Sequence, residues 1–347
     1  MTLHLPTSRI PDPALAPTIN WGIIAPGSIA DTFATALQLN TNQRVVACGS
    51  RSAERAQAFA AKHGIPRAYG SYQELVADPS VDAVYIASTQ NAHWEQALLS
   101  IDANKHVLIE KPFTLNAQQA ADVVEAGRAK GLAVMEAMWT RFLPRIDIVR
   151  QLLEDGALGD IETVMADHGQ GFDENPDFRL FDPARGGGAL LDLGIYPVSF
   201  AHFVLGTPGR IHASGTLTET GVDRQVTMLM DQYPTHRFAQ AALTTTLRAV
   251  TPTAASISGT EARVELSSDF YRPGTVRLIA RSGEAVESAP PDITEHMGLC
   301  YQAAHFATMI TEGQLESDLL PPDETVAIMR VLDEVRRQAG VSYPEEY

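Results

Sequence analysis

The sequence predicts an α/β domain with a parallel sheet, followed by an α+β domain with a large, mostly antiparallel sheet. Three observations support this. The chain has 347 residues, which allows two domains at about 100–200 residues each. Strand-like runs alternate with helical stretches as far as residue 143, and beyond it strand-like runs follow one another directly. With 45% hydrophobic and 20% charged residues, the composition is that of a folded globular protein.

The first domain is expected over residues 19–143. The expected strands are Ile19–Ala25, Arg44–Ser50, Asp82–Ser88, His106–Ile109 and Leu132–Met135, with a weaker one at Arg67–Tyr69. The expected helices are Ile29–Leu39, Ala53–His63, Tyr72–Ala77, His93–Ile101 and Ala117–Lys130. Such alternation implies parallel βαβ units, whose ligands bind at the carboxyl ends of the strands.

The second domain is expected over residues 144–347. A connecting helix is expected at Ile146–Glu154, and late helices at Leu299–Thr311 and Asp323–Gln338, which could pack back on the first domain. The expected strands are Ile161–His168, Ile211–Thr218, Gln225–Asp231, Arg237–Thr246, Ala255–Ser258, Arg263–Leu266 and Thr275–Ala280. Residues 1–18, rich in proline, are expected to form a flexible leader.

Charge and cysteine content narrow the class of protein. The net charge of −16 disfavours binding to nucleic acid or to anionic membranes. No run approaches the roughly 18 apolar residues of a membrane-spanning helix. The ten histidines are scattered without metal-ligand spacing, so no metal is expected. Two distant cysteines, Cys48 and Cys300, allow at most one disulfide and favour a reducing cytoplasm.

A turn suited to phosphate binding follows the first expected strand. It contains Ala25, Gly27, Ser28 and Ile29 and partly fits G-x-G-x-x-G/A, because Ala25 occupies the first glycine position. Free amides at the start of the next helix would bind a pyrophosphate. A tight βα turn without a nucleotide is the alternative.

The end of the second expected strand indicates which cofactor would bind. An acidic residue there would bind the ribose of NAD, but this strand ends in Ser50-Arg51, with Arg55 following. A hydroxyl and guanidinium groups suit a 2′-phosphate, so NADP is favoured over NAD. The alternative is an arginine that is simply solvated at a helix start.

The motif Glu110-Lys111-Pro112 ends the fifth expected strand. Together with the glycine turn, Val81–Ala87 and His93, it resembles the Gfo/Idh/MocA oxidoreductases. This resemblance implies a Rossmann dinucleotide-binding domain and extends from about Thr18 to Tyr347. It implies cofactor contacts from Ser88, Thr89, Asn91, His93, Glu110 and Lys111. Helix capping is the alternative role for Asn91 and His93.

The second domain adds to the resemblance through the segment from Gly186 to Pro197. If this segment is helical, Asp192 and Tyr196 project from one face. Tyrosine at 196, where many members have histidine, resembles the dimeric dihydrodiol dehydrogenase and NADP-dependent D-xylose dehydrogenase branch. Tyr196 would then be the general acid/base, Lys111 its stabilising cation and Asp192 an orienting group. A half-buried tyrosine with a capped hydroxyl is the alternative.

Together these features predict an NADP-dependent dehydrogenase that transfers a hydride between nicotinamide and a carbinol carbon. The substrate would be an aldose such as D-xylose or glucose, or a trans-dihydrodiol, held with the help of Trp139, Arg141, Phe142 and Asp192. A non-catalytic NADP-binding sensor and a sugar–sugar oxidoreductase with tightly held NADP are the alternatives. An uncovered face of the second sheet predicts a homodimer or a higher homo-oligomer.

Overall fold

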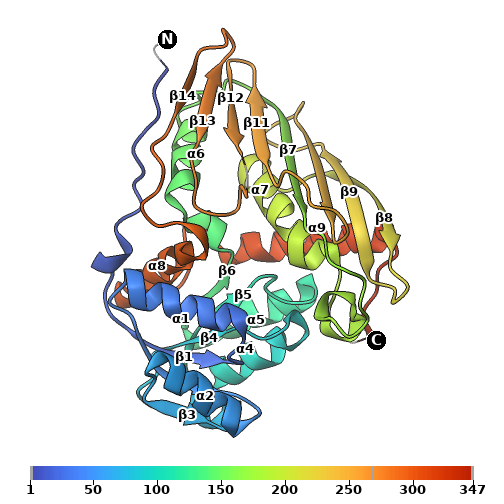
Figure 1. Cartoon of the computed structure of the whole chain (residues 1–347). Helices are drawn as coiled ribbons and strands as arrows, with labels where there is room; N and C mark the ends of the chain where they lie inside the picture. Colours follow the sequence, from blue (N-terminus) through green and yellow to red (C-terminus); the bar gives the residue numbers. More distant parts are fainter. Residues whose placement is uncertain (1–2, 268, 345–347) are drawn as a thin grey trace. The chain divides into compact units, whose positions relative to one another are not determined.

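The computed structural model describes residues 3–267 and 269–344, which group into two compact units. The parallel-sheet unit contains Pro11–Phe142 and Ile293–Val326. The antiparallel-sheet unit contains the residues up to Ile10, Leu143–Asp292 and the chain from Ala327 onward. Figure 1 shows the course of the chain through the elements of both units.

The parallel-sheet unit has a six-stranded sheet in the order β3-β2-β1-β4-β5-β6, with every neighbouring pair parallel. Its strands are β1 Asn20–Ile24, β2 Arg44–Gly49, β3 Arg67–Tyr69, β4 Ala83–Ile86, β5 His106–Glu110 and β6 Val134–Ala137. Its helices are α1 Ser28–Asn40, α2 Ala53–His63, α3 Tyr72–Val76, α4 His93–Asp102, α5 Ala117–Lys130 and α8 Leu299–Thr311. The predicted Rossmann arrangement is therefore confirmed.

The antiparallel-sheet unit has an eight-stranded sheet in the order β14-β13-β12-β11-β7-β10-β9-β8. Its strands are β7 Ile161–Gly169, β8 Arg210–Leu217, β9 Asp223–Asp231, β10 Gln240–Thr246, β11 Ala255–Gly259, β12 Ala262–Leu266, β13 Arg277–Ala280 and β14 Ala285–Glu287. The pair β7 and β10 is parallel and the other pairs are antiparallel, in keeping with the prediction of a mostly antiparallel sheet. Strand β14 was not predicted.

Helices α6 Pro144–Glu154 and α7 Ile195–Leu205 belong to the antiparallel-sheet unit, and α9 spans Pro322–Ala339. Helix α7 packs on β7 and β10 (Figure 1). The stretch Pro183–Leu205 is long and apolar enough to cross a membrane, contrary to the expectation that no segment would be. Its most apolar window is 89% buried, which is typical of a helix in a protein core.

The N-terminal residues make specific contacts where the sequence predicts a flexible leader. The Arg9 guanidinium donates to Asp147 on α6 at 2.8 and 3.1 Å and to Glu154 at 2.9 Å. In the parallel-sheet unit, Pro13–Leu15 forms a 3₁₀ turn whose Ala14 carbonyl accepts from Asn42. Buried Asp147 is thus neutralised by an arginine that is distant in sequence, a contact that local sequence patterns do not reveal.

Candidate active site

All the predicted cofactor residues lie at one edge of the parallel sheet. They follow the carboxyl ends of four strands: Ala25, Gly27, Ser28 and Ile29 after β1; Ser50, Arg51 and Arg55 after β2; Ser88, Thr89, Asn91 and His93 after β4; and Glu110 and Lys111 at the end of β5. The strand order reverses between β1 and β4. In doubly wound sheets, ligands bind in the crevice that opens at such a position.

The turn between β1 and α1 is open beside Gly27. Gly27 precedes α1 without a side-chain cap, so the first amides of the helix have no capping partner from this residue. A Cβ added at Gly27 would meet only the Ala25 carbonyl oxygen, at 3.8 Å. The local fold therefore does not require glycine here, whereas a pyrophosphate lying against the helix start would.

Ala25 has a φ of 59°, in the left-handed region that glycine adopts at little cost. We expect Ala25→Gly to stabilise the protein by about 1 kcal/mol, because an L side chain is strained by about 1–2 kcal/mol in this region. The matched control is Ala30→Gly inside α1, which should destabilise by about 1 kcal/mol. Urea unfolding measures both, and a destabilised Ala25→Gly protein would show that the strain is absent.

Two arginines follow β2 without protein partners. Among the residues that the structure describes, neither Arg51 nor Arg55 uses its guanidinium in a hydrogen bond or ion pair, and both are exposed. Both lie near the start of α2, where the helix dipole disfavours positive charge. The helix is capped instead by Ser52 Oγ, which accepts from Arg55 N at 3.3 Å. Two unpaired cations here leave donors for an anionic ligand.

The residues after β4 are engaged mainly with one another. Thr89 Oγ1 donates to Asn91 Oδ1 at 2.7 Å, and Ser88 Oγ donates to Gln96 Oε1 at 2.8 Å. His93 is 1% exposed, with Nδ1 2.9 Å from the Pro112 carbonyl oxygen and Nε2 3.1 Å from that of Ser88. Burial lowers the pKa of His93. Its imidazole therefore links the end of β4 to the turn after β5.

Lys111 begins the turn after β5 and is half-buried. The preceding residue, Glu110, is 5% exposed, and its carboxylate accepts from Tyr85 Oη at 2.5 Å and from Lys111 N at 3.2 Å. The segment is thus anchored to the neighbouring strand β4. This anchoring places a lysine at the sheet edge where the cofactor candidates gather.

The three residues predicted to line a substrate pocket after β6 are buried. Trp139 is 2% exposed and stacks on His296, with 5.4 Å between the ring centroids. Arg141 is 4% exposed and pairs with Glu324 at 2.7 Å. Phe142 is 1% exposed and packs against His305, with 5.0 Å between the ring centroids. The Arg141 guanidinium is committed to Glu324, so a substrate role for it stays a prediction.

In the antiparallel-sheet unit, buried Asp223 holds the segment that leads to Asp192. The Asp223 carboxylate accepts from Leu190 N at 2.5 Å, and burial raises the pKa of Asp223 to about 6. The backbone of Gly188 lies so close to Asp223 that a Cβ at position 188 would be 2.1 Å from Asp223 Oδ1. The φ of Gly188 is 121°, a value that L residues rarely adopt. Only glycine fits this approach.

The predicted helix around Asp192 begins with a π turn, Leu190–Gly194, before α7. Pro197 accounts for the irregularity, because it has no N–H for the carbonyl four residues earlier and its ring would collide with it. Asp192 is 7% exposed and pairs with Arg179 at 3.0 Å. Asp192 and Tyr196 therefore do not have the simple i, i+4 relation of an α-helix.

Tyr196 is 7% exposed and lies in a group of three buried rings. Its ring centroid is 4.5 Å from that of Tyr271 and 5.4 Å from that of His168, and the latter two stack at 4.6 Å. The Tyr271 hydroxyl accepts from Arg272 Nε at 3.2 Å. Sequence reasoning missed His168 and Tyr271. The polar end of the strand Ile161–His168 was the one available signal, and Tyr271 lies in a loop without one.

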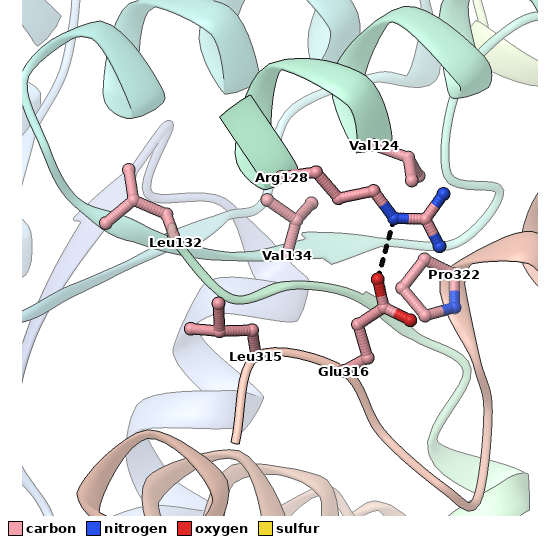
Figure 2. A pocket seen from close by; sticks show the side chains of 7 residues that line it. All are labelled: Val124, Arg128, Leu132, Val134, Leu315, Glu316 and Pro322. Atoms are coloured by element: carbon pink, nitrogen blue, oxygen red, sulfur yellow. Dashed lines mark hydrogen bonds and ion pairs between the residues drawn. The ribbon is translucent and has the colours of Figure 1, made fainter. Parts of the chain in front are cut away.

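The parallel-sheet unit has a small pocket, whose lining side chains are shown in Figure 2. Leu132, just before β6, and Val134, its first residue, contribute to the pocket at the end of the sheet opposite the carboxyl ends of the strands. Arg128 and Glu316 pair across it at 2.7 Å. It is therefore separate from the candidate cofactor site. Within residues 3–267 and 269–344, no three His, Cys, Asp or Glu side chains gather as metal ligands would.

Comparisons with known proteins place this geometry in a family. Residues 19–138 match the oxidoreductase family GFO_IDH_MocA, NAD-binding Rossmann fold, and residues 146–265 match the GFO/IDH/MocA C-terminal domain. A trans-1,2-dihydrobenzene-1,2-diol dehydrogenase from Sus scrofa is 37% identical over 336 residues, 94% of this chain and 99% of its own. The chain belongs to the Gfo/Idh/MocA oxidoreductase family. This Gfo/Idh/MocA enzyme is a dehydrogenase that acts on alcohol groups.

Two solved structures support the fold of the Gfo/Idh/MocA chain. A 3-ketoreductase from Actinomadura kijaniata in complex with NADP and TDP-benzene is 26% identical, with a TM-score of 0.80, covering 93% of this chain and 98% of its own. An aldose-aldose oxidoreductase from Caulobacter crescentus is 22% identical, with a TM-score of 0.83, and the match again covers 93% of this chain and 98% of its own. The latter likeness supports the fold alone.

Proposed function

We propose that this enzyme is an NADP-dependent dehydrogenase that transfers a hydride between nicotinamide and a carbinol carbon of a trans-dihydrodiol or a sugar. The observation that carries the proposal is the carboxyl edge of the parallel sheet, with its open glycine turn and two exposed arginines whose guanidinium groups have no partner among residues 3–267 and 269–344. The relatives named as dihydrodiol dehydrogenases support the dihydrodiol, and the NADP in the ketoreductase complex supports the cofactor.

The residues present fit this cofactor. The turn containing Ala25, Gly27, Ser28 and Ile29 would hold the pyrophosphate, and Ser50, Arg51 and Arg55 would hold the 2′-phosphate. Bound NADP accepts or supplies the hydride. The protein must then orient the substrate and carry the hydroxyl proton, and we assign that proton to Tyr196, with Lys111 as the stabilising cation and Asp192 as an orienting group.

Arg51→Ala should raise the KM for NADP by about 10- to 100-fold and change the KM for NAD little. The reason is that a charge-assisted contact worth roughly 1.5–3 kcal/mol exists only when a 2′-phosphate is present. Arg44→Ala, at the opposite end of β2, is the matched control. Steady-state kinetics with both cofactors measure the effect, and equal losses with NADP and NAD would reject the assignment.

The ring cluster favours a substrate with an apolar face. The Tyr196 ring, which carries the proposed acid/base hydroxyl, packs with Tyr271 and His168, and either a dihydrodiol ring or the C–H face of a sugar packs well against aromatic rings. Formation of NADPH with a panel of trans-dihydrodiols, aldoses and inositols tests the proposal. Tight NADP binding without turnover across the panel would favour the sensor instead. NADP retained through purification would favour the sugar–sugar oxidoreductase.

We further propose a homodimer formed through the antiparallel sheet. Met165 and Leu229, each 55% exposed, flank Ala242 across three neighbouring strands. Their strand neighbours Val164, Ala166 and Met228 are buried, so the apolar pair lies on the opposite, uncovered face. If two copies associate through this face, one twofold-symmetric interface buries the apolar pair of each copy.

Leu229→Glu should convert the dimer into a monomer, because it would bury two carboxylates in the interface. Leu39→Glu on α1, which changes a leucine that is 70% exposed, should leave the dimer intact. Light scattering at micromolar concentration measures both masses. A wild-type monomer at that concentration would exclude this assembly.

The location proposed for the enzyme is the cytoplasm. Cys48 and Cys300 are buried free thiols, and burial raises their pKa to about 11 and about 12. Thiols kept in this form suit a reducing compartment.

A further inference from the structure

Glu136 on β6 is a buried acid that the proposed reaction does not use. It is 2% exposed, and burial raises the pKa of Glu136 to about 7; the Glu110 carboxylate adds to this rise and Arg141 opposes it. A carboxyl group in such surroundings disfavours folding unless its hydrogen bonds compensate. Its contacts therefore point to a role beyond packing.

The Glu136 carboxylate reaches the turn that carries Lys111. Oε1 accepts the backbone N–H of Phe113 at 3.1 Å, and Oε2 accepts from Thr325 Oγ1 at 3.4 Å. Glu136 pairs in register with Ile109, so it lies level with the end of β5. From this position it holds the chain two residues after Lys111.

The turn is fixed at three points. Lys111 N donates to Glu110, the Pro112 carbonyl meets His93, and Phe113 N donates to Glu136. Pro112 has no N–H, so the Phe113 amide is the first main-chain donor after Lys111. Glu136 supplies the anchor on the side of β6.

We propose that Glu136 is a positioning residue, which fixes the Lys111 ammonium group for the reaction by accepting the Phe113 amide hydrogen. The inference rests on the proposed function of Lys111. The required group is a hydrogen-bond acceptor, so glutamine can replace Glu136 in this role and leucine cannot.

The position of Lys111 can be measured without substrate or cofactor. The chain has four lysines, Lys62, Lys105, Lys111 and Lys130, so reductive methylation with ¹³C-formaldehyde gives a simple NMR spectrum, and Lys111→Arg assigns the signal of interest. Glu136→Leu should shift or broaden the Lys111 signal and leave that of Lys130 unchanged. Glu136→Gln should keep the wild-type spectrum. Thr325→Val, which removes only the second contact of Glu136, is the matched control.

Kinetics provide a second measurement. Glu136→Leu should lower kcat by about 10- to 100-fold with little change in the KM for NADP, because a displacement of about 1 Å at a reacting group has effects of this size. Glu136→Gln should restore kcat to within about threefold of the wild type. A purely structural role would not give this rescue together with an unchanged KM.

Two results would overturn the inference: an unchanged Lys111 signal in Glu136→Leu, or a Glu136→Gln spectrum as altered as that of the leucine variant. If Glu136→Leu does not fold, the rate of hydrogen exchange at the Phe113 amide of the wild-type protein tests whether Glu136 anchors the turn. Slow exchange supports the anchor, and exchange as fast as in exposed loops refutes it. Absence of turnover with every substrate would count against the proposed function, whereas the NMR result would still decide the role of Glu136.

Discussion

Tyr196→Phe is expected to lower kcat by about 10²–10⁴ on the best substrate while NADP binding survives. The change keeps the ring, and so keeps the packing against Tyr271 and His168, but removes the hydroxyl that would carry the proton. If Tyr196 carries the proton as proposed, oxidation in the wild type should rise with pH to a plateau, because the proton acceptor must be an anion.

Tyr233→Phe is the matched control. Tyr233 is 2% exposed in the same unit, and its hydroxyl has no hydrogen-bond partner among the residues described, so its loss should leave kcat unchanged. Rapid-quench or steady-state kinetics give kcat, and fluorescence titration gives the affinity for NADPH. A near-normal kcat in Tyr196→Phe would mean that Lys111 or Asp192 carries the proton and that Tyr196 serves only in packing.

Lys111→Met should lower kcat by about 10²–10³ and move the remaining pH dependence upward, because the tyrosinate would lose its stabilising cation. Lys130→Met, which removes an exposed lysine paired with Asp102, should have no such effect. The pH profile of kcat distinguishes a lost cation from a general loss of structure, because general damage would lower the profile without moving it.

The double variant tests whether the two residues act together. If Lys111 works through Tyr196, the double variant should be little slower than the slower single variant, because residues that act as a unit have non-additive effects. Losses that simply multiply would mean that Lys111 serves another step, such as holding the cofactor.

The sequence predicts the parallel-sheet unit well because its central strands, β1 and β4, are buried on both faces. The residues Ile23 and Ile24 of β1, and Val84 and Tyr85 of β4, are all fully buried, and continuous apolar runs of this length between helices are typical of the strands of a parallel sheet. The glycine turn and the Glu110-Lys111 motif then fall at the carboxyl edge through topology alone.

Contacts between distant residues account for what the sequence does not predict. Arg141 looked available for a substrate, but its partner Glu324 lies 183 positions away. Strand β14 is three residues long, too short to show an alternating pattern, so only its pairing with β13 defines it. The ring cluster depends on a loop tyrosine, Tyr271, whose neighbours are set by tertiary packing.

The π turn at Leu190–Gly194 has a consequence for comparing this enzyme with its relatives. Such a turn holds one residue more than an α turn, and each residue of an α-helix rotates the chain by about 100°. A relative that lacks the extra residue would present a different side chain at the angle where Asp192 points. Here an insertion or deletion of one residue changes the helical phase, so the side chain presented just before Tyr196 can change without a substitution at position 192.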